Sequence, residues 1–280
     1  MSIYGVLGET TSYPKTYSPN VLYPIARSIG RDEIVKDTNY RGEYVGVDIW
    51  QAFELSWLNA QGISQMAMAR ISVPAISLNI VESKSFKLYF NSLNFSQFAD
   101  WQTVQQTIAK DLTACAGAEV LVMLYPLDTQ ALHICRPLGE CIDGVLDDDG
   151  HTVALTDDID SVLLQGMAMG DDVAEWVFYS NLLRSNCPVT NQPDWGTLQI
   201  SIRTKTVLDF GKILAYVLSF RQHNGFHEQC VERIFADCMQ YFAPISLTVQ
   251  ANYTRRGGID INPVRVFNAA VPVVGRLIRQ

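Results

Sequence analysis

Apolar and polar residues alternate in part along two neighbouring stretches, 48–59 and 63–73, which the short segment 60–62 separates. Alternation with a period of two is typical of strands that bury one face, so the two stretches predict a hairpin. Beyond it, apolar residues first recur at helical spacing and then form an extended run. This pattern predicts two helices and a closing strand, at 83–98, 100–112 and 118–127.

The second part of the chain repeats this order of elements. A strand pair, two helices and a last strand are predicted at 177–185, 196–205, 210–222, 227–242 and 245–254. Both halves are therefore β-β-α-α-β, and the repeat is one of pattern rather than of identical residues. The repeat predicts an α+β fold with two tandem modules, each an antiparallel sheet with helices packed on one face.

An acidic stretch with little periodicity, DGVLDDDGHTVALTDDID, lies between the two predicted modules. Such a stretch is typical of a connection rather than of a core. We therefore predict a first module at 1–145, a connection at 146–175 and a second module at 176–280.

Composition and charge limit the classes of partner. The chain has 280 residues, 48% of them hydrophobic, and is long enough to bury one or two cores. Its net charge of −8 disfavours broad contact with a phosphate backbone, so no direct nucleic-acid partner is expected. No apolar run approaches the ~20 residues that span a bilayer, and the first residues lack the pattern of a signal peptide. We expect a cytoplasmic protein with no membrane partner, whose scattered cysteines are free thiols.

The segment SNCPVTNQPDWG, residues 185–196, is the most distinctive difference between the two halves. The first half joins its strands with the short NAQG, whereas the second inserts a longer, proline-containing loop that holds Cys187 and Asp194. A thiol can act as a nucleophile, and a carboxylate within reach can transfer its proton. A negative neighbour disfavours the thiolate, so proton transfer is the better role for Asp194. The alternative is a surface turn with a structural cysteine.

A second candidate site begins the helix predicted at 227–242, where His227 and Glu228 follow Asn224 and Gly225. A carboxylate is favourable near the positive end of a helix, and such positions present side chains to a cavity. The alternative is a terminal charge with no further role. His223 lies four residues before His227, but Asn224 and Gly225 are expected to break the helix between them, so no metal site is predicted.

Two further segments could bind an anion. Residues 80–87 hold Glu82, Ser83, Lys84 and Ser85 at a strand-to-helix junction, where free N–H groups and a lysine could meet a negative group. The alternative is helix capping by Ser83 or Ser85, with Glu82 in solvent. In YTRRGGIDINP, arginines stand beside glycines, an arrangement that suits phosphate but equally an ordinary turn.

Five motifs occur in a fixed order: GVDIWQAFELSWLN, ESKSFKLYFNSLN, SNCPVTNQPDWG, FHEQCVERIF and YTRRGGIDINP. Together they resemble the NADPH-dependent 7-cyano-7-deazaguanine reductases of queuosine biosynthesis, a tRNA modification pathway, in their long, two-module form. The resemblance covers most of the chain from about residue 40 and is weakest in the acidic connection. It implies the tunnelling fold (T-fold), with two fused modules of antiparallel sheet and helices, and a homodimer.

The resemblance also implies residue roles. Cys187 would add to the nitrile of 7-cyano-7-deazaguanine to give a covalent thioimide, Asp194 would donate a proton, and His227 would belong to the same catalytic centre. Two hydride transfers from two NADPH molecules would then lead through an imine to the amine. The implied substrate contacts are Val81, Glu82, Ser83, His227 and Glu228. The implied NADPH contacts are Ser83, Lys84, Arg256 and Gly257.

Three other functions use some of the same residues. A cysteine hydrolase would use Cys187 and His227 to cleave a nitrile or amide with water, releasing ammonia without NADPH. A zinc cyclohydrolase with the same fold would require a metal. A purine-binding module without catalysis would keep its affinity when Cys187 is replaced.

Overall fold

The structure is a computed structural model that describes residues 13–146, 153–154 and 156–280. Its chain forms two compact units whose segments alternate along the sequence, and each unit has its own hydrophobic core. The first unit holds the described residues up to Ile29, with Val47–His133 and Arg255–Ile261. The second unit holds the described residues of Gly30–Gly46, Ile134–Thr254 and Asn262–Gln280. The predicted connection falls partly outside the described residues, and the predicted module boundaries stay a prediction.

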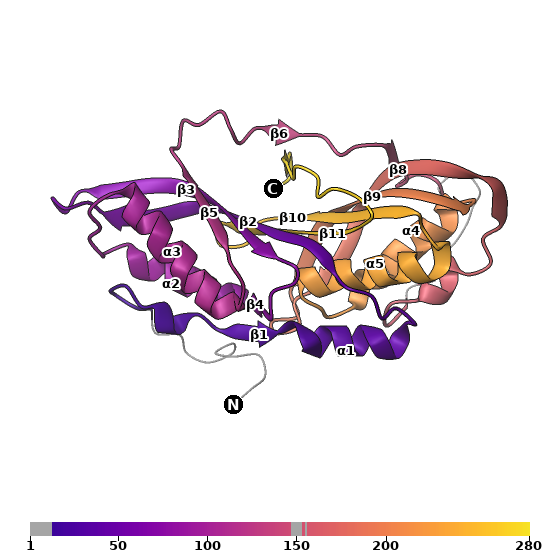
Figure 1. Ribbon diagram of the computed structural model, residues 1–280, viewed down its shortest axis with the longest axis horizontal. Coiled ribbons are helices and arrows are strands. Elements are labelled where there is room, and N and C mark those ends of the chain that lie inside the picture. Colours follow the sequence, from indigo (N-terminus) through magenta and orange to yellow (C-terminus); the bar gives the residue numbers. More distant parts are fainter. Residues whose placement is uncertain (1–12, 147–152, 155) are drawn as a thin grey trace. The chain divides into compact units, whose positions relative to one another are not determined.

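The first unit is an antiparallel sheet covered on one face by two helices (Figure 1). Its strands are β1 (Pro24–Ala26), β2 (Val45–Leu58), β3 (Ser64–Pro74), β4 (Asn79–Val81) and β5 (Leu121–Tyr125). The main sheet has the order β5-β3-β2, and β1 pairs with β4. The helical elements are η1 (Pro19–Val21), α2 (Ser83–Leu93) and α3 (Trp101–Ala116). The buried residues of α3 recur every four positions, which explains how this helix packs: Val104, Ile108, Leu112 and Ala116.

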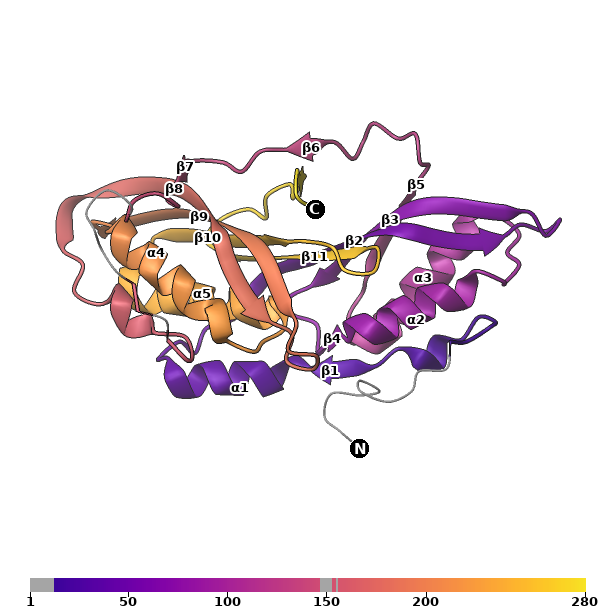
Figure 2. The same cartoon turned by 180° about the vertical axis from the view of Figure 1, so that it is seen from behind.

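The second unit repeats this layering, with α4 and α5 against one face of its sheet (Figure 2). Its strands are β6 (Ile134–Cys135), β7 (Glu140–Cys141), β8 (Met169–Asn186), β9 (Pro193–Thr206), β10 (Ser246–Tyr253), β11 (Ile259–Phe267) and β12 (Arg276–Leu277). Its helical elements are α1 (Arg27–Asp37), η2 (Ser161–Leu164), α4 (Phe210–Ser219), η3 (Phe220–Gln222) and α5 (His227–Phe242). The strand order is β11-β10-β9-β8-β7, antiparallel except between β7 and β8. The first three residues of α1 and of β11 belong to the first unit, and the remaining residues of each belong to the second.

The predicted α+β class and the repeated element order are confirmed, as β2-β3-α2-α3-β5 and β8-β9-α4-α5-β10. The helix predicted at 83–98 is too long, because α2 ends at Leu93. Beyond it the backbone turns back to strand β2, where Leu58 donates to Ser96 and accepts from Phe98. Among the described residues, no helix is both long and apolar enough to cross a bilayer.

Three elements differ from the sequence prediction for physical reasons. Helix α1 was not predicted, since RSIGRDEIVKD contains a glycine and few apolar residues. Strand β11 is not predicted by the sequence, because polar residues and Pro263 interrupt its apolar positions. The strand predicted at 245–254 is therefore not the last. Strand β8 starts at Met169, inside the predicted connection, because its first residues pair with the end of β9.

Helix α5 buries charged side chains along much of its length. Glu232, which is 2% exposed, accepts from Arg265 Nη2 at 2.8 Å and from Arg31 Nη2 at 2.7 Å. Arg265 on β11 is itself 0% exposed. A buried carboxylate is tolerated only when cations and hydrogen bonds replace its hydration, so these arginines fix where α5 lies on the sheet.

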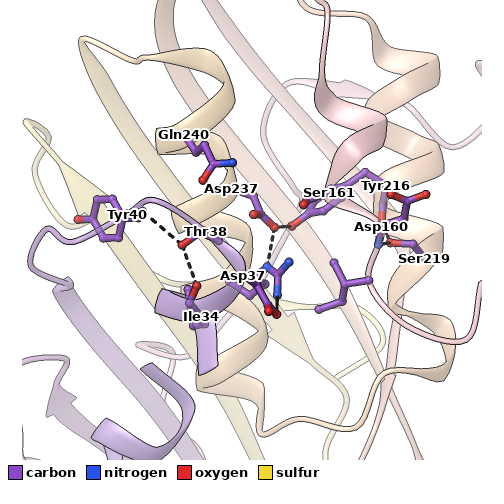
Figure 3. A network of polar contacts seen from close by, with 12 residues as sticks. Ile34, Asp37, Thr38, Tyr40, Asp160, Ser161, Tyr216, Ser219, Asp237 and Gln240 are labelled. Carbon is purple, nitrogen blue, oxygen red and sulfur yellow. Dashed lines mark hydrogen bonds and ion pairs between the residues drawn. The ribbon is translucent and has the colours of Figure 1, made fainter. Parts of the chain in front are cut away.

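One turn further along α5, Asp237 and Arg233 connect this helix to α4 and α1 (Figure 3). Asp237 Oδ2 accepts from Tyr216 Oη at 2.6 Å and from Arg233 Nε at 2.9 Å, and Arg233 Nη1 also lies 2.8 Å from Asp37 Oδ2. Burial raises the pKa of Asp237, although the neighbouring Arg233 opposes this shift. The helix is therefore held by directional polar contacts as well as by its apolar face.

Replacing Arg265 by Met should lower the free energy of unfolding by about 3–5 kcal/mol, since it leaves Glu232 buried without its main cation. Urea unfolding followed by circular dichroism measures the change. The double variant Arg265→Met with Glu232→Met is the control, and it should be less destabilised than Arg265→Met alone because no uncompensated charge remains. A loss below about 1 kcal/mol in the single variant, as for an exposed ion pair, would contradict this account.

Candidate active site

The loop between β8 and β9 presents Cys187 at the tip of a hairpin. Cys187 N donates to Gln192 O and Asn191 N donates to Cys187 O, both at 2.9 Å. Asn191 adopts a φ of 53°, which asparagine tolerates better than most residues. The loop is shorter than the sequence predicted, because Pro193 and Asp194 already belong to β9 and pair with Asn186 and Ser185. Cys187 is half-buried at the start of this loop.

Asp194 is buried beside the start of helix α5. Its side chain is 6% exposed, and its Oδ1 lies 3.4 Å from His227 Nε2. Strand β9 sets the position of this carboxylate, because Asp194 stands opposite Ser185 in the antiparallel register. One hairpin therefore carries both the thiol and the carboxylate, and the carboxylate is in contact with the imidazole of a third element.

His227 is the first residue of α5, as the sequence predicted. The preceding Gly225 leaves no room for a Cβ, which would lie 2.8 Å from His223 Nε2. The His227 ring stacks on Tyr253, with ring centroids 3.8 Å apart and planes 8° from parallel. Its Nδ1 is buried and has no hydrogen-bond partner within the described part of the chain. The stack and the Asp194 contact hold the imidazole in one orientation.

Glu228, the second residue of α5, is 3% exposed. The positive end of the helix favours a carboxylate there, and its burial takes it out of solvent. Cys230 and Tyr253 lie in the same buried surroundings, where burial raises the pKa of Cys230 to about 12 and also raises the pKa of Tyr253. Cys230 is thus kept as a neutral thiol and differs in its surroundings from the half-buried Cys187.

The strand-to-helix junction of the first unit is organised by Glu82. Its side chain is the N-cap of α2, accepting from Lys84 N at 2.8 Å and from Ser85 N at 2.6 Å. Glu82 is 1% exposed, and burial raises its pKa. Two expectations are corrected here: the cap is neither Ser83 nor Ser85, and Glu82 is not in solvent. These two backbone N–H groups already bind a carboxylate, so an incoming anion must rely on side chains.

A cavity of about 400 Å³ opens beside this junction in the first unit. Lys84 and Lys87 of α2 line it together with Gly257 and Gly258, and the two glycines have φ values of 56° and 73°. A Cβ on Gly257 would lie 3.2 Å from Lys87 Cδ. The glycines therefore allow both the turn and the close approach of the lysine. This volume lies within the range of small-molecule sites, and two lysines suit a phosphate-bearing ligand.

The predicted site residues fall into two groups. Cys187, Asp194, His227 and Glu228 belong to the second unit. The first unit holds the other predicted contacts, which are Val81, Glu82, Ser83, Lys84, Arg256 and Gly257. Val81 ends β4, Ser83 begins α2, and Arg256 forms a turn with Ile259 through paired backbone hydrogen bonds. The described residues contain no group of three His, Cys, Asp or Glu side chains able to hold a metal ion.

Comparison with known proteins gives the same family along the whole chain. Residues 13–124 match the family model "Nitrile reductase, 7-cyano-7-deazaguanine-reductase N-term", and residues 193–270 match "QueF-like protein". The NADPH-dependent 7-cyano-7-deazaguanine reductase of Psychrobacter cryohalolentis is 58% identical over 100% of both chains. The proteins of the same name from Psychrobacter arcticus and Acinetobacter baumannii (strain ATCC 17978) are 57% and 50% identical, over 100% and 98% of both chains. This chain belongs to the NADPH-dependent 7-cyano-7-deazaguanine reductase family.

A solved structure titled as the archaeosine synthase QueF-Like in the apo form is 15% identical, with a TM-score of 0.31. It covers 35% of this chain and 95% of its own.

The structure of this reductase family member adds two candidate site residues that the sequence did not predict. Lys87 lines the same cavity as Lys84 and lies three residues further along α2. Helical spacing could have found it, because residues three apart share a helix face. Tyr253, which stacks on His227, could not have been found this way, since it ends a strand far from His227 in sequence.

Proposed function

We propose that this chain reduces the nitrile of 7-cyano-7-deazaguanine to 7-aminomethyl-7-deazaguanine with NADPH, through a covalent thioimide on Cys187. The family and the names of its members support the overall reaction. The observation that carries the mechanism is the β8–β9 hairpin, which holds Cys187 at its tip and the buried Asp194 in contact with His227. Thiol and acid must converge on one C≡N group, and a single hairpin can present both.

In the first step, the Cys187 sulfur forms a bond to the nitrile carbon. One π bond of the C≡N group becomes a lone pair on nitrogen, and Asp194 donates the proton that this nitrogen needs. The proton of the Cys187 thiol passes to Asp194 and replaces the one that it donated, so the addition balances. His227 Nε2 lies 3.4 Å from Asp194 Oδ1, and this contact keeps the carboxyl oriented while its proton is moved.

When bound, NADPH would supply a hydride in each of two successive reductions, and each reduction would also take up one proton. Cys187 would leave between the two, when the C–S bond breaks and its electron pair returns to sulfur, and the substrate would end as the primary amine. Cys187 is free at the end, so the residue acts as a true catalyst across the four-electron reduction.

A guanine-like ring presents an N1–H and an exocyclic amine as adjacent donors, which an ionised carboxylate can accept together. Glu228 at the start of α5 is our first choice for this role, with His227 beside it. Glu82 is a second acceptor, and its neighbours Val81 and Ser83 complete the substrate contacts that we propose. Because Glu82 already accepts two backbone N–H groups, its orientation is fixed before substrate arrives.

For the cofactor, we propose Ser83, Lys84, Arg256 and Gly257, and we add Lys87. The cavity supports Lys84, Lys87 and Gly257, which line it together with Glu54, whereas Ser83 and Arg256 rest on the family resemblance. Helix α2 offers an anion its lysine side chains, since Glu82 occupies the N–H groups of Lys84 and Ser85.

The proposal also covers the pathway and the fold family. We place the product in queuosine biosynthesis for tRNA modification, and assign the modules to the tunnelling fold. Homodimeric assembly and a cytoplasmic location stay predictions.

The decisive experiment mixes the protein with 7-cyano-7-deazaguanine without NADPH and records the intact mass. We expect a one-to-one adduct on Cys187, absent in the Cys187→Ala variant, which should remain folded. With NADPH added, the nitrile should be consumed and the amine should appear. Absence of the adduct while the complete system turns over would refute the covalent mechanism. Release of ammonia without use of NADPH would indicate a hydrolase instead.

Replacing Asp194 by Asn keeps the side-chain shape but removes the transferable proton. We expect the turnover rate to fall by about 10²–10⁴-fold, the usual contribution of a general acid. Steady-state NADPH oxidation measures the loss. Asp171→Asn, at an exposed position on the same hairpin, is the matched control and should keep the wild-type rate. An unchanged rate in Asp194→Asn at an unchanged melting temperature would reject the assignment.

Replacing Lys87 by Ala should weaken NADPH binding by about 10–100-fold, as expected when a charge-assisted hydrogen bond is lost. Titration calorimetry with NADPH measures the affinity, and formation of the nitrile adduct without NADPH should not change. Lys110→Ala, at an exposed position on α3, is the control. Equal NADPH affinity in wild type and Lys87→Ala would exclude Lys87 from the cofactor site.

A further inference from the structure

Asn186, the last residue of β8, immediately precedes Cys187 and is 7% exposed. Its backbone N donates to His223 O at 2.8 Å, and its carbonyl accepts from Gly225 N at 3.1 Å. Its side-chain Nδ2 donates to Gln222 O at 3.1 Å. One residue thus makes three hydrogen bonds to the turn that leads into α5.

These bonds use the edge of β8 that faces away from β9. Cys187 N donates across the hairpin to Gln192 O, so its neighbour Asn186, which stands opposite Pro193, directs its N–H and carbonyl away from β9 and toward the turn. The backbone of Asn186 thereby forms a parallel bridge with Asn224 in the turn. The hydrogen bonds of the Cys187 backbone run to Gln192 and Asn191, within the loop itself. Asn186 is therefore where the thiol-bearing loop is attached to a neighbouring element.

The attachment closes a ring of contacts around the proposed catalytic residues. From Asn186 the turn runs to His227, and His227 contacts Asp194. Asp194 returns to the hairpin, because it pairs with Ser185, the residue before Asn186. Movement of the turn would therefore change the position of Cys187 relative to both Asp194 and His227.

We propose that Asn186 is a positioning residue for Cys187, and that its side-chain amide holds the loop in register with the turn before α5. The proposal rests on the proposed role of Cys187 as the nucleophile. Asn186 does not touch the reacting atoms. Its loss should slow carbon–sulfur bond formation and leave substrate and cofactor affinity unchanged, because a displacement of about 1 Å can cost about 10²-fold in rate.

The test compares Asn186→Ala with Asn224→Ala. Asn224 is the bridge partner of Asn186, but it is exposed and takes part through its backbone, so its side chain is a matched control. Asn186→Asp is a second variant that keeps the side-chain shape but, when ionised, cannot donate to the Gln222 carbonyl. It keeps the proposal testable if Asn186→Ala does not fold.

Rapid mixing with 7-cyano-7-deazaguanine and mass detection give the adduct-forming rate at saturating nitrile and the concentration for half-saturation. We expect Asn186→Ala and Asn186→Asp to lower the saturating rate by about 10–100-fold with little change in half-saturation. Asn224→Ala should match the wild type. An unchanged saturating rate in both Asn186 variants, or an equal loss in Asn224→Ala, would overturn the proposal.

Hydrogen–deuterium exchange of the segment 187–192 provides a measurement that does not depend on the chemistry. Exchange there should become faster in both Asn186 variants and stay unchanged in Asn224→Ala. If the wild type forms no adduct, the proposed function fails, and exchange alone still decides whether Asn186 holds the loop. Unchanged exchange in the Asn186 variants would refute the positioning role whatever the enzyme does.

Discussion

The geometry of the second unit depends on the ion pairs of one buried carboxylate, that of Glu232. It lies between Arg265 of β11 and Arg31 of α1, and a buried charge of this kind cannot exchange its partners for apolar contacts. Glu232 stands one helical turn after Glu228 and close to His227 in sequence. The ionic group therefore fixes the register of α5 on the sheet, and with it the place where His227 meets Asp194.

Helix N-termini serve different purposes in the two units. In the first unit, Glu82 fills the end of α2 by accepting two backbone N–H groups, so positive charge must come from lysine side chains. In the second unit, α5 starts after Phe226, whose N–H donates to Gln229 Oε1 at 3.2 Å. Its first turn carries His227 and Glu228 themselves. One terminus thus lies beside a lysine-lined cavity, and the other carries the imidazole and carboxylate that we propose for catalysis and substrate recognition.

The sequence predicts those parts of the fold that local pattern determines. The bounds of α5 are confirmed, because Asn224 and Gly225 interrupt the chain before a long amphipathic run. By contrast, α1 and the end of β11 have little periodicity of their own and are stabilised by partners such as Glu232, which are distant in sequence. The start of β8 is similar, since only its pairing with β9 makes it a strand. Tertiary contacts determine these elements, and a single-sequence pattern does not contain them.

The same division applies to the candidate site. Cys187 could be singled out by residue type, because a cysteine and an aspartate stand on one proline-containing segment. Loop length was a poorer guide, since the structure has six residues between β8 and β9 (187–192) and five between β2 and β3 (59–63). The cap role of Glu82 and the stack of Tyr253 on His227 could not be singled out, because each depends on side-chain direction rather than on residue type. Each unit buries its own core, and the two hairpins differ in the residues that they carry more than in their length. The hairpin of the second unit carries Cys187, which we propose as the nucleophile, and the first unit has a lysine-lined cavity at its glycine-rich segment.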